Sequence, residues 1–299
     1  MSAPYPPTLK QLQYLVALLD HGHFGRAAAA CFVTQSTLSA GLRELETLLG
    51  VSLVERTRRV VRFTPLGETV ADKARRVLRE ADELGELARA SGRPLSGDLR
   101  LSVIPTIAPF ILPQVLPRLR RDYPTLRLFL REEPSGSACE ALGAGRADCV
   151  LLALPYACGD VTAQALFQDR LFVAFPGDGR DAPPTLRPGD IDETQLLMLE
   201  DGHCLTEHAL AACDRPELRG HARMLGTSLH TMVRMVEGGL GVTMLPEMAL
   251  AAGILDGTGV AARPLDAPHA ARTVALAWRR GSPRERDFRL LAEVFAQGR

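Results

Sequence analysis

The chain has 299 residues, 46% of them hydrophobic, with a mean hydropathy of +0.02, which is typical of a globular protein of about two domains. Its 35 basic and 35 acidic side chains give a formal net charge of zero, which at first argues against a nucleic-acid partner. No apolar run approaches the roughly 18 residues of a membrane span. The first ten residues, MSAPYPPTLK, lack the apolar stretch of a secretory signal. We therefore expect a cytoplasmic protein with no membrane partner, whose six cysteines are too few for a disulfide scaffold and stay reduced.

The charge is distributed unevenly along the chain. Residues 1–62 carry seven basic and four acidic side chains, a net charge of +3, whereas residues 63–96 are balanced and the remainder sums to −3. A small basic segment therefore precedes a mildly acidic body. An excess of three charges can also arise by chance, so charge alone leaves a role in DNA binding open.

The first 65 residues predict three short helices followed by a basic hairpin. Apolar residues recur at helical spacing from Leu9 to Leu19, and an alanine-rich stretch covers 24–31. A third helix is expected over 36–49, with these residues on its core face: Leu38, Leu42, Leu45 and Leu49. Two β-like stretches, 53–55 and 60–63, enclose a basic wing. This order is typical of a winged helix-turn-helix domain, which we place at residues 7–65.

The third helix is expected to enter the major groove of double-stranded promoter DNA, with its N-terminal residues at the base edges. Glutamine can pair with adenine, and arginine can pair with guanine or bind phosphate. Arginines of the wing are expected at phosphates or in the minor groove, although a solvated surface charge is the alternative for each of them. The predicted DNA-binding residues are Gln35, Ser36, Thr37, Ser39, Arg43, Arg56, Arg58 and Arg59.

A long helix is predicted next, over residues 66–91. Its apolar positions are spaced by four and three residues in alternation, which averages to the 3.5-residue repeat of a coiled coil: Val70, Ala74, Val77, Ala81, Leu84 and Ala88. We interpret it as a linker and dimerisation helix; the alternative is a helix packed on its own domain. Residues 92–98 hold glycines and a proline and are read as a hinge.

Residues 99–299 alternate between predicted strands and helices, which predicts an α/β effector domain with a largely parallel sheet. Strands are expected at 99–104, 126–130, 149–154, 171–175, 196–199, 242–245 and 273–278, with helices at 228–237 and 284–295. The length suits two lobes, lobe I at about 99–169 and 273–299 and lobe II at about 170–272. Prolines recur every four residues from Pro105 to Pro117, so the helix after the first strand is expected to be short or bent.

The segment LQYLVALLDHGHFGRAAAACFVTQSTLSAGLRELETLLGVSLVERT, together with FTPLGE, resembles the LysR-type transcriptional regulators, and the resemblance extends over the whole chain. Many members carry proline where this chain has Ser36, and either residue can open a helix. The resemblance implies a homo-oligomer, a dimer or tetramer, on a pseudo-palindromic promoter site. It also implies a two-lobed effector domain like the periplasmic binding proteins, no enzymatic activity and no cofactor.

Within that family, LLMLEDGHCLTEHALAAC resembles the redox segment of the OxyR hydrogen-peroxide sensors, as do VIPTIAPFILP, GTSLHTMV and ARTVALAWRRGSP. The resemblance implies that Cys204 reacts with peroxide and that Cys213 resolves the product to a disulfide. Glu207 stands where aspartate is commoner and Ser135 where threonine is common. The implied peroxide pocket consists of Thr106, Ser135, His203, Glu207, Thr227, Ser228 and Arg272.

The residues around Cys204 fit this chemistry. A thiolate is the attacking form, and a helix expected over 205–212 would place Cys204 at an N-terminus, where free N–H groups favour an anion. Nine residues of helix rise about 13 Å, whereas a disulfide needs Cα atoms within about 7 Å. Oxidation is therefore expected to unwind this segment, and the refolding to be the output signal. The resemblance implies that this signal alters promoter contact and recruits RNA polymerase at antioxidant genes.

Other interpretations remain open. Cys31 and Cys149 are expected in the core, and Cys139 and Cys158 have no partner that the sequence identifies. A zinc cluster is conceivable from these residues, but their spacing lacks the usual pair of cysteines: His203, Cys204, His208 and Cys213. The alternative functions are a LysR-type regulator of a small organic ligand, a thiol peroxidase and a metal sensor.

Overall fold

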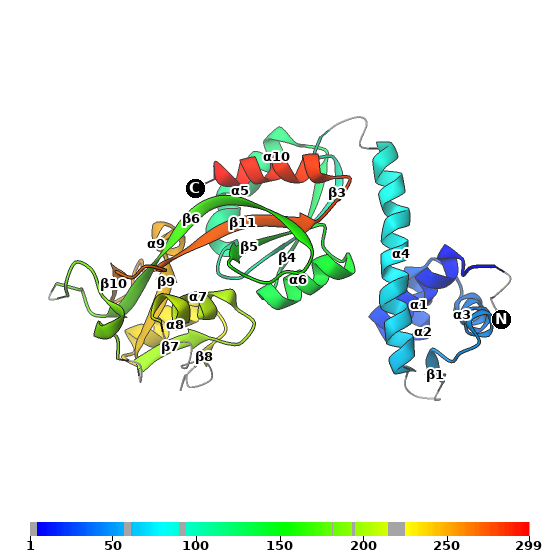
Figure 1. Cartoon of the computed structure of the whole chain (residues 1–299), viewed down its shortest axis with the longest axis horizontal. Helices are drawn as coiled ribbons and strands as arrows, with labels where there is room; N and C mark the ends of the chain where they lie inside the picture. The colour runs from blue at the N-terminus through cyan, green and yellow to red at the C-terminus, as the bar shows by residue number, and fades with distance from the viewer. Residues whose placement is uncertain are drawn as a thin grey trace. The chain divides into compact units, whose positions relative to one another are not determined.

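The structure is a computed structural model that describes residues 5–56, 61–89, 94–180, 182–192, 195–214 and 225–298. The chain divides into two compact units, residues 1–92 and 93–299, here called the N-terminal and C-terminal units (Figure 1). Across the residues described, no helix is long and apolar enough to cross a membrane.

The N-terminal unit is a winged helix-turn-helix, as predicted. Its elements are α1 Leu9–His21, α2 Phe24–Ala30, α3 Gln35–Leu49, β1 Val54–Arg56, β2 Val61–Phe63 and α4 Pro65–Arg89. Helix α3 begins after Thr34, whose side chain accepts a hydrogen bond from the Thr37 N–H, and it ends at Gly50, which adopts φ 68°. Leu38, Leu42 and Leu45 of α3 are buried against α1 and α2, so the opposite face of α3 is left to solvent.

Helix α4 differs in burial along its length. Ala71 and Ala74 are buried in the core of the N-terminal unit, where α4 contacts α1. Farther along the same helix, Val77 is 48% exposed and Leu84 is 69% exposed. The first part of α4 is therefore packed on its own unit, and the second part presents apolar side chains to solvent.

The C-terminal unit is an α/β domain built on one nine-stranded sheet. Its strands are β3 Gly97–Val103, β4 Leu126–Glu132, β5 Cys149–Leu154, β6 Val161–Pro176, β7 Leu196–Leu199, β8 Leu225–Gly226, β9 Val242–Pro246, β10 Val260–Pro264 and β11 Ala271–Arg279. Its helices are α5 Ala108–Asp122, α6 Ser135–Ala144, α7 Cys204–Ala212, α8 Leu229–Glu237, α9 Glu247–Ala251 and α10 Glu285–Ala296, with a 3₁₀ turn at Pro188–Asp190.

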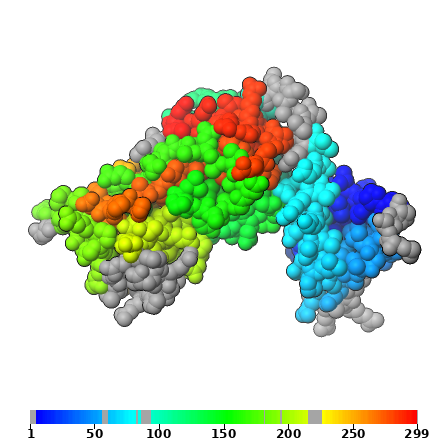
Figure 2. Space-filling view, viewed as in Figure 1, coloured from blue at the N-terminus to red at the C-terminus, as the bar shows by residue number. Residues whose placement is uncertain are grey.

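The sheet is mixed, so the expectation of a largely parallel sheet was wrong. The strand order is β4-β3-β5-β11-β6-β9-β7-β8, with β10 also paired to β6. Strand β3 is parallel to β4 and β5, but β11 returns from the end of the chain and pairs antiparallel with both β5 and β6. Figure 2 accordingly shows atoms of the C-terminal residues, in red and orange, directly against mid-chain residues in green.

Strand β6 connects two hydrophobic cores. Its first half pairs with β11, and its second half pairs with β9 and β10. The first core gathers β3, β5, β11 and α10, and the second core gathers the second half of β6 with β7, β9, β10 and α8. The strands change partners at Asp169, which is the register partner of Arg272. The two hydrophobic cores therefore share β6.

Helix α5 is longer than its prolines suggested. It runs for 15 residues and includes Pro113 and Pro117, so of the two expectations, a short or a bent helix, the short one was wrong. Pro109, Pro113 and Pro117 recur every four residues and all lie on the exposed face, where the carbonyls that lose a hydrogen bond can be hydrated. Burial of the opposite face, with Ile111 and Val115 in the first core, holds the helix together.

Candidate redox site and DNA-binding surface

Cys204 and Cys213 mark the two ends of α7. Cys204 is the first residue of the helix, after the N-cap His203, and Cys213 is its C-cap. Both are free thiols and both are buried, with 1% and 6% of their surface exposed. Cys204 belongs to the first hydrophobic core and Cys213 to the second. Helix α7 therefore bridges the two cores, with one thiol in each.

The helix keeps the two thiols apart. Nine residues of α-helix rise about 13 Å along the axis, well beyond the Cα separation that a disulfide allows. Burial raises the pKa of the Cys213 thiol to about 11, so this thiol is protonated at neutral pH. Cys204 begins the helix, where the first N–H groups have no partner within the helix.

Two histidines belong to the first half of α7 and its N-cap, and burial favours the neutral form of both. Burial lowers the pKa of His203 and of His208, and the positive charge of Arg272 lowers that of His208 further. The Nε2 atom of His208 lies 2.9 Å from the carbonyl oxygen of Pro155, whereas its buried Nδ1 atom has no hydrogen-bond partner among the described residues. His208 thereby ties α7 to the segment after β5.

Tyr156 is a neighbour of this site that the sequence did not reveal. Burial raises the pKa of its phenol, and the negative charges of Glu207 and Cys204 raise it further. Tyr156 packs against the first core, to which Cys204 also belongs. The segment of Pro155 and Tyr156 therefore lies beside the first turn of α7.

Arg272 is fixed where β6 and β11 change partners. Its Nε donates to the Asp169 carboxylate at 3.0 Å, and its Nη1 and Nη2 donate to the hydroxyl and carbonyl oxygens of Thr106 at 2.8 and 3.0 Å. Both charged side chains are essentially inaccessible, at 0% and 1% exposure. Asp169 also accepts a hydrogen bond from the N–H of Met248. The buried ion pair between β6 and β11 is therefore also bonded to α9.

The other residues implied as a peroxide pocket differ in their exposure. Ser135 opens α6 and is buried, and its hydroxyl has no hydrogen-bond partner among the described residues. Ser228 is half-buried and caps α8, accepting a hydrogen bond from the Thr231 N–H. Thr227 and Glu207 are exposed. Of the implied set, Thr106 and Arg272 are joined by hydrogen bonds.

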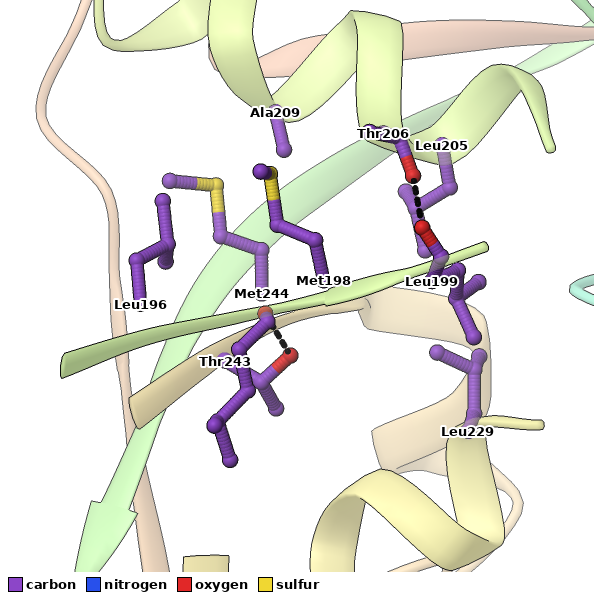
Figure 3. Close-up of a pocket in the computed structure, with 10 residues that line it drawn as sticks. Leu196, Met198, Leu199, Leu205, Thr206, Ala209, Leu229, Thr243 and Met244 are labelled. Atoms are coloured by element: carbon purple, nitrogen blue, oxygen red, sulfur yellow. Dashed lines mark hydrogen bonds between the residues drawn. The ribbon is translucent and has the colours of Figure 1, made fainter. Parts of the chain in front are cut away.

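The inner face of α7 packs tightly on β7 (Figure 3). The Thr206 hydroxyl donates to the carbonyl of Leu199 at 3.1 Å, and Thr243 of β9 donates likewise to the carbonyl of Leu197 at 3.0 Å. Between these bonds lies a cavity of about 20 Å³, lined mainly by leucine and methionine side chains. That volume holds about one water molecule, so this interface has no room for a larger effector.

The cysteines outside α7 required a correction. Cys139 of α6 and Cys158 form a disulfide, so the expectations that these two have no partner and that all six cysteines are reduced were wrong. The sequence hides this pair because Cys158 follows β5 in an irregular segment that returns to α6. Cys149 is buried in β5 as expected, and Cys31 is half-buried against the core of the N-terminal unit.

The side chains that could bind a metal ion are dispersed in the described part of the chain. Within it, no three histidine, cysteine, aspartate or glutamate side chains lie close enough to hold a metal ion. His203, Cys204, His208 and Cys213 all belong to that part, and α7 spreads them over its length.

The exposed face of α3 carries the polar residues expected at DNA. Gln35, Ser36, Thr37 and Arg43 are exposed, and Ser39 is half-buried, with its hydroxyl 3.4 Å from Arg43 Nη1. Arg56 ends β1, and Arg58 and Arg59 lie outside the described residues. The turn before α3 holds Phe32, 96% exposed with φ 54°, a surface residue that helical periodicity could not single out.

Comparison with known proteins gives the family. Residues 9–68 match the bacterial regulatory helix-turn-helix of the LysR family, and residues 92–299 match the LysR substrate binding domain. The chain belongs to the LysR family of transcriptional regulators. It is thus a DNA-binding regulator and not an enzyme, and the thiol-peroxidase hypothesis was wrong.

Two relatives and one solved structure are similar to this LysR-family chain over nearly all its length. The transcriptional regulator EstR of Acinetobacter baylyi is 41% identical over 290 residues, 96% of each chain. The dual regulator OxyR of Escherichia coli is 39% identical over 290 residues, 96% of this chain and 94% of its own. A full-length OxyR variant from Pseudomonas aeruginosa superposes with a TM-score of 0.80 at 35% identity, covering 97% and 95% of the two chains.

Proposed function

We propose that this LysR-family regulator is a cytoplasmic sensor of hydrogen peroxide that acts through Cys204 and Cys213. The observation that carries the proposal is the position of the two thiols, one at each end of α7 and one in each hydrophobic core. The similarity to OxyR proteins, among them the E. coli regulator, supports peroxide as the effector.

The chemistry begins at Cys204. Its thiolate form attacks one peroxide oxygen; the O–O bond breaks, water leaves after protonation, and a sulfenic acid remains. The Cys213 sulfur then displaces the sulfenic oxygen as a second water and closes the disulfide. One peroxide is consumed for each disulfide formed, so the reaction is stoichiometric and not catalytic.

The second step requires α7 to unwind. Cys213 is buried in the second core and protonated, and about 13 Å of helix separates it from Cys204. Closing the disulfide draws both ends of the helix together and removes at least one thiol from its core. Because α7 packs on both cores, its refolding changes how they are held together, which is the proposed output.

The output is carried to promoter DNA and RNA polymerase by an oligomer. Helix α3 presents its exposed N-terminal residues to the major groove, and α4 pairs with a second copy through its exposed Val77 and Leu84. A dimer brings two basic N-terminal units to the DNA, and a tetramer brings four. Oxidation of the C-terminal units alters how the N-terminal units are placed on the promoter, and the oligomer then recruits RNA polymerase at antioxidant genes.

A second candidate is a small organic effector. A cavity of about 130 Å³ lies where α5, β6 and α9 meet, with Phe110, Phe167 and Glu247 in its wall. Such a cavity admits a small molecule, and EstR, one of the similar regulators, has a name that mentions no peroxide. In this case the signal would not need either thiol of α7.

Replacing Cys204 with serine distinguishes the two candidates. We expect Cys204→Ser to abolish peroxide-dependent transcription from the regulated promoter while DNA binding by the reduced protein is retained. Cys31→Ser, a half-buried free cysteine of the N-terminal unit, is the matched control and should respond normally. A Cys204→Ser protein that regulates its promoter as the unmodified protein does would rule out peroxide sensing at this cysteine and favour the organic effector.

A further inference from the structure

A second thiol pair lies in the C-terminal unit, outside α7. Cys139 stands in the middle of α6, and Cys158 stands four residues after the end of β5. They form a disulfide with a Cα separation of 5.1 Å, inside the ordinary range for such bonds. In contrast to the thiols of α7, this pair can open and close without unwinding a helix.

Small reagents can reach this pair. Cys139 and Cys158 are both half-buried, whereas Cys149, Cys204 and Cys213 are buried. The two cysteines line a surface hollow of about 410 Å³ beside α6, the green helix labelled in Figure 1. An accessible disulfide in a protein proposed to work in a reducing compartment is more typical of redox regulation than of structural support.

The disulfide is attached to the surroundings of Cys204 from two sides. Cys158 is two residues from Tyr156 and three from Pro155, whose carbonyl accepts from His208 of α7. On the other side, a Cβ atom at Gly136 of α6 would lie 3.4 Å from the Tyr156 hydroxyl. The disulfide therefore fixes to α6 the same segment that lies beside the first turn of α7.

Helix α6 also touches the segment that leads into Cys204. A Cβ atom at Gly202 would lie 3.6 Å from the Pro134 side chain, and Pro134 is the N-cap of α6. Cys139, Cys158, Tyr156 and Cys204 all pack in or against the first core. Cys204 is only 1% exposed, so a reagent reaches it only when this packing opens locally.

We infer that Cys139 and Cys158 form a second, reversible redox site, whose disulfide holds residues 155–158 against α6 and limits access to Cys204. This inference rests on the proposed function only in naming Cys204 as the group whose access is controlled. When the pair is reduced, residues 155–158 lose their covalent link to α6, and the segment beside α7 opens more often.

The redox step is balanced with a hydroperoxide as oxidant. The thiolate of one cysteine attacks the peroxide, the O–O bond breaks, and a sulfenic acid and one water or alcohol are produced. The second thiol then displaces the sulfenic oxygen as water, forming the S–S bond, so two thiols and one hydroperoxide give one disulfide. A dithiol reductant reverses the step by thiol–disulfide exchange and is itself oxidised to a disulfide.

The test uses the full-length protein and compares its two redox states. Protein as purified and protein reduced with dithiothreitol, then freed of it, are each treated with iodoacetamide, and the alkylation rate of Cys204 is followed by peptide mass spectrometry. We expect Cys204 to react several-fold more slowly while Cys139 and Cys158 are bonded. We also expect mild oxidation of the reduced protein to re-form the bond.

The double variant Cys139→Ser, Cys158→Ser supplies the control, and its Cys204 should react at the faster rate with or without dithiothreitol. The comparison of the two states of the unmodified protein stands alone if that variant does not fold. Equal Cys204 rates in both states, or free thiols at 139 and 158 after mild oxidation, would overturn the inference. Because neither DNA nor peroxide is used in the rate measurement, a failure here is distinguishable from a failure of peroxide sensing.

Discussion

The buried pair of Arg272 and Asp169 shows how single residues hold the C-terminal unit together. The resemblance to OxyR proteins pointed to Arg272, but nothing in the sequence pointed to Asp169, which lies 103 residues away and meets it only through the strand register. Thr106 completes the arrangement from the segment after β3. Three segments distant in the sequence thus meet at one guanidinium group.

Replacing Arg272 with leucine should therefore be costly. The change leaves the Asp169 carboxylate buried without its counter-ion, which typically costs about 3–5 kcal/mol. Urea unfolding can be followed by fluorescence of Trp278, the one tryptophan of the sequence, which is buried in the first core. Arg280→Leu, which removes an exposed ion pair with Asp160, is the control and should cost at most about 1 kcal/mol. Equal losses in the two variants would show that the buried pair contributes no special stability.

His208 predicts a pH dependence of stability. Its pKa in the folded protein is lowered from 6.5, because burial and Arg272 oppose the charged form, although Glu207 and the Pro155 carbonyl favour it. The unfolded chain therefore takes up a proton near pH 6.5 that the folded chain resists, and stability falls as the pH drops through that value.

The measurement is the urea midpoint from pH 8 to pH 5 for the unmodified protein and His208→Gln. Glutamine keeps an N–H donor for the Pro155 carbonyl but does not titrate, so the variant should lose less stability on acidification. The exposed His269→Gln serves as the control and should follow the unmodified protein. A His208→Gln profile that also follows the unmodified protein would contradict the assignment.

At the scale of elements, continuous apolar runs were predictable and alternating ones were not. The apolar runs at β5 and β7 predicted the first and last residues of both strands correctly. Every residue of the two strands except Leu154 is buried, so each run is continuous. Strand β6 was predicted only over 171–175, since its first half alternates with polar residues such as Gln164 and Gln168. The short β8 and β10 were missed, because neither has a run or alternation that stands out from a loop.

The wing provides a test of the DNA-binding unit that rests on the sequence. Arg58→Ala with Arg59→Ala should weaken binding to all DNA sequences and flatten the salt dependence of affinity. A dimer that loses four phosphate contacts should show a slope of log affinity against log salt that is smaller by about three to four. Fluorescence anisotropy with specific and random duplexes at several salt concentrations measures it.

The matched control for that experiment is Arg120→Ala with Arg121→Ala, which removes two positive charges from α5 of the C-terminal unit. This double variant should show the same slope of log affinity against log salt as the unmodified protein. An unchanged slope in the wing variant would place Arg58 and Arg59 away from the phosphates.

For the whole molecule, the sequence predicted the two-part organisation but not how the second part closes. Strand β11 comes from the end of the chain and lies between β5 and β6, an order that local patterns cannot predict because it depends on long-range pairing. The disulfide of Cys139 and Cys158 escaped notice for the same reason. Helix α7, with one thiol in each core, gains its importance only from this arrangement.

The central claim is that peroxide converts Cys204 and Cys213 into a disulfide. Its most direct test is thiol mapping of the reduced full-length protein, titrated with up to one equivalent of hydrogen peroxide, alkylated and analysed by peptide mass spectrometry. We predict that a Cys204–Cys213 linked peptide accumulates first, while Cys31 and Cys149 remain alkylated as free thiols. If Cys204 remains a free thiol throughout the titration, or becomes linked to a cysteine other than Cys213, the account is contradicted.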